Sequence, residues 1–230
     1  MCTRYISPEV AAIERHWHVG RANPWRGTEA SVDVFPGYQG KFIRASARAD
    51  AHGGTNPPVP ELVSGQWNLI PWFAKEAKLK FTTCNARSEE MAAKASYKLP
   101  WARGQRCIIP AQAFFEPNWE SGKHVRWRFE RRDGAPWGLA GLWNTWVDKT
   151  TGEIHESYTM LTLNADAHPL MQRMHKPDPK LAAHAQDKRS VVPIELADAS
   201  RWLYGTQAEA QGLIRLTDAQ AFHAGPQVER

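Results

Sequence analysis

Residues 125–163 read VRWRFERRDGAPWGLAGLWNTWVDKTTGEIHESYTMLTL, and this stretch decides the fold class of the chain. Aromatic and β-branched residues dominate three runs, Val125–Arg131, Trp137–Val147 and Ser157–Leu163, which predicts three strands. The dipeptide Asp133-Gly134 and the polar residues after Val147 predict the turns between them. The stretch therefore predicts a meander of antiparallel strands.

The same reasoning extends outward from the meander. Strands are predicted at Lys41–Ala45, Glu61–Pro71, Phe81–Arg87, Arg106–Pro110 (continued by Ala111–Glu116) and Arg189–Leu196. Helices are predicted at residues 8–18, 88–97, 165–173 and 198–204, and Trp72–Lys80 is predicted as a short basic helix or loop. Residues 49–60 are predicted to form an exposed loop, residues 177–188 a loop insertion, and the tail after about residue 205 is weakly patterned. The pattern predicts a single β-rich α+β domain spanning residues 1–230.

Composition narrows the class of protein. The chain has 230 residues and a net charge of +5, which suits a polyanionic partner without requiring one. Its three cysteines form no CxxC pair, and no glycine-rich phosphate loop or HExxH motif is present, so no metal site, cofactor or disulfide framework is expected. No apolar run suggests a signal peptide or membrane span, so a cytoplasmic protein with no membrane partner is expected. A monomer is expected, although no sequence pattern indicates the oligomeric state.

The first four residues, Met1-Cys2-Thr3-Arg4, carry distinctive chemistry. Removal of Met1 would leave Cys2 with an α-amine and a thiol on adjacent carbons, and both groups ionise near neutral pH. Such a pair captures an aldehyde twice, because the amine forms an imine and the thiol then closes it to a thiazolidine. The alternative is a second residue that is simply small.

The segment Asn85-Ala86-Arg87-Ser88-Glu89 is a second candidate. A strand end that presents an amide and a guanidinium suits a ligand site, and arginine matches the geometry of phosphate. The alternative is a helix entry capped by Ser88. Trp67 and Trp72 flank the turn Asn68–Pro71, and they are either core residues or a stacking surface for unpaired bases.

Two titratable residues complete the candidates. Glu116 ends an apolar run, where partial desolvation suits general acid–base chemistry. The alternative is a solvated strand end or an ion pair. His175 follows the apolar turn LMQRM, and His168, seven residues earlier, competes with it. Each histidine alone is equally compatible with a surface or structural role.

Four blocks in order resemble the SOS-response-associated peptidase family, whose members cap abasic sites in single-stranded DNA. MCTRY resembles its MCGRY, GQWNLIPWFAK its WGLIPxW, and RCIIPAQAFFEP its RCLIPADGFYEW, while NARSE matches without change. The family's H-x-R-M-P block departs most. We align His175 with its histidine and place an insertion before Lys188-Arg189; the other alignment sets Met171 at the histidine.

The resemblance implies a β-rich α+β domain with a mixed, barrel-like sheet, short flanking helices and a basic cleft for single-stranded DNA. It implies autocatalytic removal of Met1 and a thiazolidine between Cys2 and the abasic-site aldehyde. Asn85 would hold the N-terminal residue, Glu116 would shuttle protons, and His175 would assist sugar-ring opening. DNA contacts would come from Arg4, Trp67, Trp72, Arg87 and Ser88. The protein would associate with the nucleoid when bound to damaged DNA.

Two other functions stay open at this stage. An N-terminal-nucleophile hydrolase would use Cys2 to attack a peptide or amide carbonyl. A single-strand-binding module would leave Cys2 incidental. Arg4, Arg87 and the tryptophans favour DNA over a peptide, and no oxyanion hole can be located in the sequence.

Overall fold

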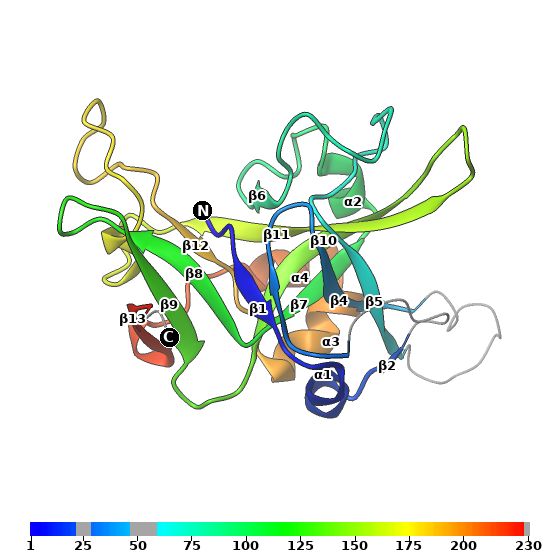
Figure 1. The fold of residues 1–230 in the computed structure, drawn as a ribbon, viewed down its shortest axis with the longest axis horizontal. Helices are drawn as coiled ribbons and strands as arrows, with labels where there is room; N and C mark the ends of the chain where they lie inside the picture. The colour runs from blue at the N-terminus through cyan, green and yellow to red at the C-terminus, as the bar shows by residue number, and fades with distance from the viewer. Residues whose placement is uncertain (22–28, 47–58, 228–230) are drawn as a thin grey trace.

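A closed barrel of five strands forms the centre of the fold in this computed structural model, which describes residues 1–21, 29–46 and 59–227. Its strands are β4 (Gln39–Ala45), β5 (Pro60–Trp67), β7 (Arg106–Ala111), β10 (Trp137–Val147) and β11 (Ile154–Asn164). They pair in the order β11-β10-β7-β4-β5, and β5 returns to β11 in a parallel pairing that closes the ring. The barrel-like, β-rich α+β fold predicted from the sequence is confirmed. Figure 1 shows the β10–β11 hairpin extending beyond the barrel.

Three short strands extend this sheet. β6 (Asn85–Arg87) pairs in parallel with β11, β12 (Arg189–Val191) pairs antiparallel with β11, and β2 (Gly20–Arg21) pairs with β5. The C-terminal end of β11 therefore lies between β6 and β12. The segment NARSE and the strand that follows residues 177–188 thus flank the same strand.

A second sheet has the order β13-β9-β8-β1-β3. Its strands are β1 (Tyr5–Ser7), β3 (Val32–Val34), β8 (Ala113–Asn118), β9 (Val125–Arg131) and β13 (Phe222–Pro226). The N-terminal strand β1 lies between β3 and β8 and is antiparallel to both. The predicted strands at 125–131 and 137–147 are confirmed to the residue.

The connections between strands correct two predictions. Residues 106–116 are not one strand, because the chain passes from the barrel to the second sheet at Gln112, whose N–H donates to the carbonyl of Ile6 at 2.8 Å. The predicted hairpin across Asp133-Gly134 is also wrong. The turn, in which Gly134 has φ +77°, leads from β9 in the second sheet to β10 in the barrel, where Trp137 pairs with Ala111. Only β10 and β11 form the predicted hairpin.

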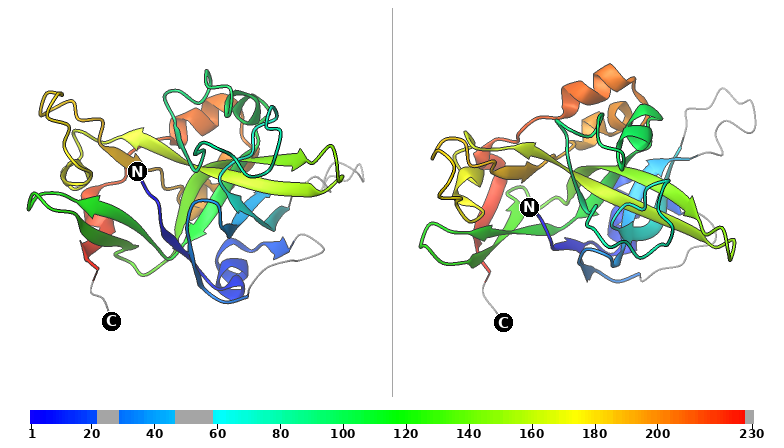
Figure 2. Two further views of the ribbon diagram at one scale, coloured as in Figure 1. Left: turned by 45° about the horizontal axis from the view of Figure 1, so that its top comes forward. Right: turned by 90° about the horizontal axis from the view of Figure 1, so that it is seen from above.

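The helices are short and lie outside the barrel. They are α1 (Val10–Trp17), α2 (Lys98–Ala102), α3 (Ala199–Tyr204) and α4 (Gln207–Leu213). In the right-hand view of Figure 2, α3 and α4 (orange) lie on one side of the barrel strands and the N-terminal strand (blue) on the other. Strand residues alternate between two cores, as the two-residue period of a strand requires. Ile108 and Leu142 face the helices, whereas Cys107 and Leu139 face the second sheet.

Two predicted helices are wrong. Residues 88–97 form a series of turns, since the backbone N–H of Ser88 extends the β6 ladder to Thr162 and Glu89 is held by tertiary partners. Residues 165–173 contain only the 3₁₀ helix Met171–Arg173. The helices predicted at 8–18 and 198–204 are confirmed by α1 and α3, with a 3₁₀ turn before α3.

The remaining segments differ in outcome. Residues 72–80 form turns, the strand predicted at 81–87 is limited to β6, and the one at 189–196 is limited to β12. Residues 177–188 contain no helix or strand, in agreement with the predicted loop. Most of the predicted loop at 49–60 lies outside the described residues. The tail is more ordered than its pattern suggested, because it forms α4 and the edge strand β13. No helix in the described ranges has the length and apolar character to span a membrane.

Candidate functional site at the N-terminus

The first residues of the chain lie among β6, β8, β11 and β12 (Figure 1). Pairing of Tyr5 with Phe114 sets the register of β1 on β8, and the N–H of Phe115 donates to the carbonyl of Arg4 at 3.0 Å. Cys2 is thereby fully buried, although it lies one residue from the chain end. The fold itself therefore fixes the position of the N-terminal segment.

The carboxylate of Glu116 lies at the centre of the site. The residue is 2% exposed, and one oxygen, Oε2, meets both the Met1 amine at 3.5 Å and Nε2 of His175 at 2.8 Å. Glu116 reaches this position from β8, the strand that also pairs with β1. A single buried carboxylate therefore contacts both the chain terminus and an imidazole.

His175 is held by its backbone. Its φ of +62° is in the left-handed region, and its N–H donates to the carbonyl of Pro117 at 2.7 Å. Among the described residues its second ring nitrogen, Nδ1, is buried without a hydrogen-bond partner. His168, the competing candidate, is placed elsewhere: its Nδ1 accepts from the backbone N–H of Leu170 and Met171, and its Nε2 contacts the carbonyl of Thr217 at 2.7 Å. The structure thus brings His175 to Glu116 and gives His168 a structural role.

Asn85 contacts the N-terminal segment from the opposite strand, β6. Its Nδ2 donates to the carbonyl of Cys2 at 2.7 Å and to Sγ of Cys84 at 3.3 Å. Its Oδ1 is buried and has no partner in the part of the chain that the structure describes. The backbone before Asn85 is fixed by Trp67, whose indole N–H donates to the carbonyl of Cys84 at 2.8 Å. The amide is therefore preorganised, with one acceptor atom left free.

The thiol of Cys2 donates to the carbonyl of Arg4 at 3.3 Å. Burial raises the pKa of this thiol well above its ordinary value, and the nearby Glu116 carboxylate raises the pKa further. While Met1 is present, Cys2 is therefore a protonated thiol at neutral pH. A protonated thiol is a poorer nucleophile than a thiolate.

Within the NARSE segment, Asn85 contacts the N-terminal site, whereas the other residues contact the surrounding fold or solvent. Ala86 is buried, and Glu89 accepts from the backbone N–H of Asn164 at 2.9 Å and from both terminal nitrogens of Arg189. The predicted cap by Ser88 is wrong: its hydroxyl is buried with no hydrogen-bond partner among the described residues. Its predicted DNA contact would therefore require Ser88 to become exposed.

The two arginines predicted to contact DNA are ion-paired. Arg4 lies over the Phe115 ring, and all three of its guanidinium nitrogens donate to Asp33 or Gln227. Arg87 is 42% exposed and pairs with Glu90 and with Asp187 of the loop insertion. Arg87 is thus the more accessible of the two, and phosphate contacts by either remain predictions.

The two tryptophans differ in their exposure to solvent. Trp67 is fully buried and meets Tyr5 edge to face at a centroid distance of 5.1 Å, so the prediction that it offers a stacking surface is wrong. Trp67 instead supports the site through its hydrogen bond to the carbonyl of Cys84. Trp72 is 63% exposed and lies against Phe73, with Phe81 also exposed in the same segment. Only Trp72 of this pair is available to stack on a base.

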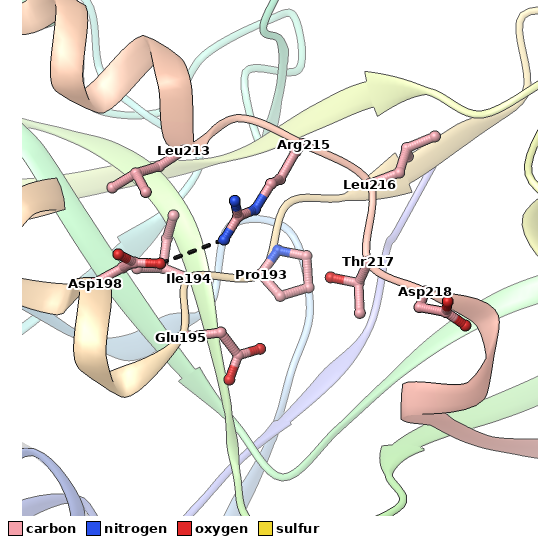
Figure 3. Close-up of a pocket in the computed structure, with 9 residues that line it drawn as sticks. All are labelled: Pro193, Ile194, Glu195, Asp198, Leu213, Arg215, Leu216, Thr217 and Asp218. Carbon is pink, nitrogen blue, oxygen red and sulfur yellow. Dashed lines mark hydrogen bonds and ion pairs between the residues drawn. The ribbon is translucent and has the colours of Figure 1, made fainter.

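Sequence reasoning missed two residues at the site. Lys188 donates to the carbonyl of His175, and Cys84 contacts Asn85; neither stands in a pattern that would identify it. A cavity of about 190 Å³ lies elsewhere, between the segments around Glu195 and Asp218. Figure 3 shows Arg215 of this cavity directed toward Asp198, and none of the candidate site residues lines it. The candidate site around Cys2 therefore lies apart from this cavity.

The chain is similar to known proteins. A family model described as SOS response associated peptidase (SRAP) matches residues 1–228. The chain is 30% identical over 129 residues to abasic site processing protein YoaM of Bacillus subtilis (56% of this chain, 55% of YoaM). It is 31% identical over 125 residues to abasic site processing protein HMCES of Gallus gallus (45% of this chain, 37% of HMCES). The chain thus matches about half or less of the length of these relatives.

Solved structures share the whole fold. A crystal structure of a protein from Bordetella bronchiseptica superposes with a TM-score of 0.82 at 32% identity, covering 99% of this chain and 100% of that one. A protein from Bacteroides thetaiotaomicron at 21% identity shares the fold with a TM-score of 0.72, over 97% of this chain and 90% of that one. The family match covers nearly the whole sequence, and the chain therefore belongs to the SOS response associated peptidase family.

Proposed function

We propose that this protein captures abasic sites in single-stranded DNA through Cys2, after Met1 has been removed. The observation that carries the proposal is the shared oxygen of Glu116, which meets the chain terminus and His175 while Asn85 holds the Cys2 carbonyl. The names of the relatives, abasic site processing proteins, support the substrate.

Removal of Met1 is the first proposed step. Water adds across the Met1–Cys2 peptide bond, methionine leaves with a new carboxyl group, and Cys2 gains a free α-amine. Glu116 is placed to take a proton from the attacking water, and His175 is placed to return one to the departing nitrogen. The α-amine of Cys2 would then replace that of Met1 as the chain terminus near Glu116.

Capture is the second proposed step. An abasic deoxyribose opens to an aldehyde when a proton leaves its 1′-hydroxyl and another reaches the ring oxygen. The imidazolium form of His175, with one proton on Nε2 toward Glu116 and one on Nδ1, would supply the second proton through Nδ1, which has no hydrogen-bond partner among the described residues. The Cys2 amine attacks the aldehyde carbon, and loss of water gives an imine. The Cys2 thiol then adds to the imine carbon, its proton passes to the nitrogen, and a thiazolidine results.

Thiol closure explains why a cysteine is needed. An imine alone promotes β-elimination, which breaks the DNA strand, because its cationic nitrogen draws electrons from the adjacent carbon. The thiazolidine has no such cation, so the strand stays intact. Arg87 and Trp72, both exposed, would bind a phosphate and an unpaired base next to the abasic site.

The test compares wild type with Cys2→Ser and Cys2→Ala on an oligonucleotide that carries one abasic site. Wild type should give a heat-stable adduct without reductant. Both variants should give an adduct only when borohydride traps the imine. Stable adducts from Cys2→Ala without reductant would refute the thiazolidine, and cleavage of model peptides by wild type, without capture of DNA, would favour the hydrolase.

A further inference from the structure

The backbone of His175 requires an external restraint. A non-glycine residue with φ near +62° occupies a sparsely populated conformation, which persists only when neighbouring groups stabilise it. His175 is also followed by residues 176–187, which are largely exposed and contain no helix or strand. The chain after His175 therefore supplies no regular structure that would fix the imidazole on Glu116.

The Pro117 carbonyl restrains this turn through the N–H of His175, and Lys188 restrains it from the far end of the insertion. Its side chain is buried, and Nζ donates to the carbonyl of Met174 at 2.7 Å and to the carbonyl of His175 at 2.7 Å. Burial lowers the pKa of this ammonium, while the carboxylate of Asp166 acts in the opposite direction. A buried ammonium is stable only when its N–H groups find acceptors, so Lys188 and the two carbonyls stabilise each other.

We propose that Lys188 is a positioning residue for His175, an inference that rests on the proposed function of the site. Its ammonium ties the two carbonyls on either side of the left-handed turn, and this holds Nε2 of His175 against Oε2 of Glu116. The insertion can then extend from the domain without loosening the imidazole. Lys188 acts through His175 and does not itself contact the reacting atoms.

The first experiment tests position independently of DNA. In the wild-type background, Glu116→Gln should change the ring resonances of His175 in NMR spectra, because the two side chains are in contact. In a Lys188→Met background, the same Glu116→Gln change should leave those resonances nearly unmoved. The matched control is Lys180→Met, since Lys180 lies exposed in the same loop and should preserve the wild-type response. An equal response to Glu116→Gln in both backgrounds would overturn the inference.

The second experiment measures capture of an abasic oligonucleotide at saturating DNA. Lys188→Met should slow adduct formation roughly tenfold to a hundredfold, the range expected for loss of a charge-assisted hydrogen bond. In a His175→Ala background the substitution should have no further effect. If Lys188→Met does not fold, Lys188→Gln, which retains two N–H donors on a shorter side chain, replaces it in both experiments and should show a smaller loss.

The outcomes separate the two proposals. An unchanged rate in the Lys188 variant, or the same loss with and without His175, contradicts the role of Lys188 while capture by wild type stands. If wild type forms no adduct, the proposed function fails, and the NMR comparison alone decides whether Lys188 positions His175.

Discussion

One carboxylate oxygen connects the two proposed steps. Glu116 is almost completely buried, and the same Oε2 meets the Met1 amine and His175. In the proposed function, processing and capture would therefore depend on a common acid–base pair, while Asn85 holds the carbonyl of Cys2, the residue proposed to react. A change at Glu116 should affect both steps together.

Glu116→Gln preserves the shape of the side chain and removes its charge. It should slow Met1 removal and abasic-site capture by about a hundredfold each, the usual contribution of a general acid–base group. Mass spectrometry measures retained Met1, and denaturing gels measure the adduct. Glu120→Gln is the matched control, because Glu120 pairs with Arg173 at the surface. Wild-type rates for both steps in Glu116→Gln would remove this residue from the mechanism.

If Arg87 binds a DNA phosphate as proposed, Asp187 would compete with the DNA for it. The two side chains form an ion pair, and both are partly exposed. The ion pair therefore contributes about 1 kcal/mol or less to stability. Asp187→Asn should therefore strengthen single-strand binding by at most about fivefold at low salt. Arg87→Ala should weaken binding and reduce the slope of log affinity against log salt by about one. Fluorescence anisotropy measures both, and a salt slope unaffected by Arg87→Ala would argue against a phosphate contact.

Strand β8 positions three parts of the candidate site. It pairs with β1 to position Cys2, presents Glu116 and provides the Pro117 carbonyl that holds His175. β8 is stabilised in turn by β9, which is flanked by β13 from the end of the chain. The second sheet thus connects the tail to the site.

The ring of Phe222 in β13 anchors this connection. It is 2% exposed, with its centroid 5.1 Å from that of Trp137 and 6.1 Å from that of Phe129. Phe222→Ala should lower the free energy of unfolding by about 3–4 kcal/mol, as expected for truncating a buried phenylalanine. Urea denaturation measures the loss, with Phe222→Leu expected to lose less. A loss below about 1 kcal/mol would show that β13 does not anchor the second sheet.

Local patterns predicted individual elements well and their partners poorly. Alternating aromatic and branched residues located Val125–Arg131 and Trp137–Val147 to the residue. The same patterns do not specify that the chain changes sheets at Gln112 and after Arg131, because sheet membership depends on long-range pairing. The predicted helix at residues 88–97 failed because Arg189 and Asn164 hold Glu89 from distant parts of the chain.

Prediction of the site residues shows the same contrast between local patterns and long-range contacts. Family motifs indicated Cys2, Asn85 and Glu116, which the fold brings together around the N-terminus. The alignment favoured His175 over His168, but its position at Glu116 could not be predicted, because a left-handed backbone and a lysine 13 residues further along place its ring. A buried lysine in a polar stretch gives no sequence signal.

Viewed as a whole, the molecule buries several groups that must stay protonated. The thiol of Cys107 and the hydroxyls of Tyr5 and Tyr158, which hydrogen-bond to each other, are fully buried, and burial raises the pKa of each. The folded chain therefore binds more protons than the unfolded chain at alkaline pH. By linkage, stability present below about pH 9 is lost as the pH rises above it.

The free energy of unfolding should fall by up to about 1.4 kcal/mol per pH unit for each such group, beginning near pH 9 for the Cys107 thiol and near pH 10 for the two tyrosine hydroxyls. Thermal melts between pH 7 and 10.5 measure the effect. Cys107→Ala removes one of the groups and should give a shallower decline, although its stability at pH 7 is lower. A melting temperature at pH 10 equal to that at pH 8 would contradict the burial of these protons.

The most direct test of the account is the intact mass of the purified protein before and after incubation with a single-stranded oligonucleotide carrying one abasic site. The account predicts a protein that lacks Met1, and then a heat-stable product whose mass equals protein plus oligonucleotide minus one water. Borohydride should add no hydrogen to that product, because the thiazolidine has no imine to reduce. A protein that retains Met1 and forms no adduct would contradict the central claim, and it would leave single-strand binding without chemistry as the function to test.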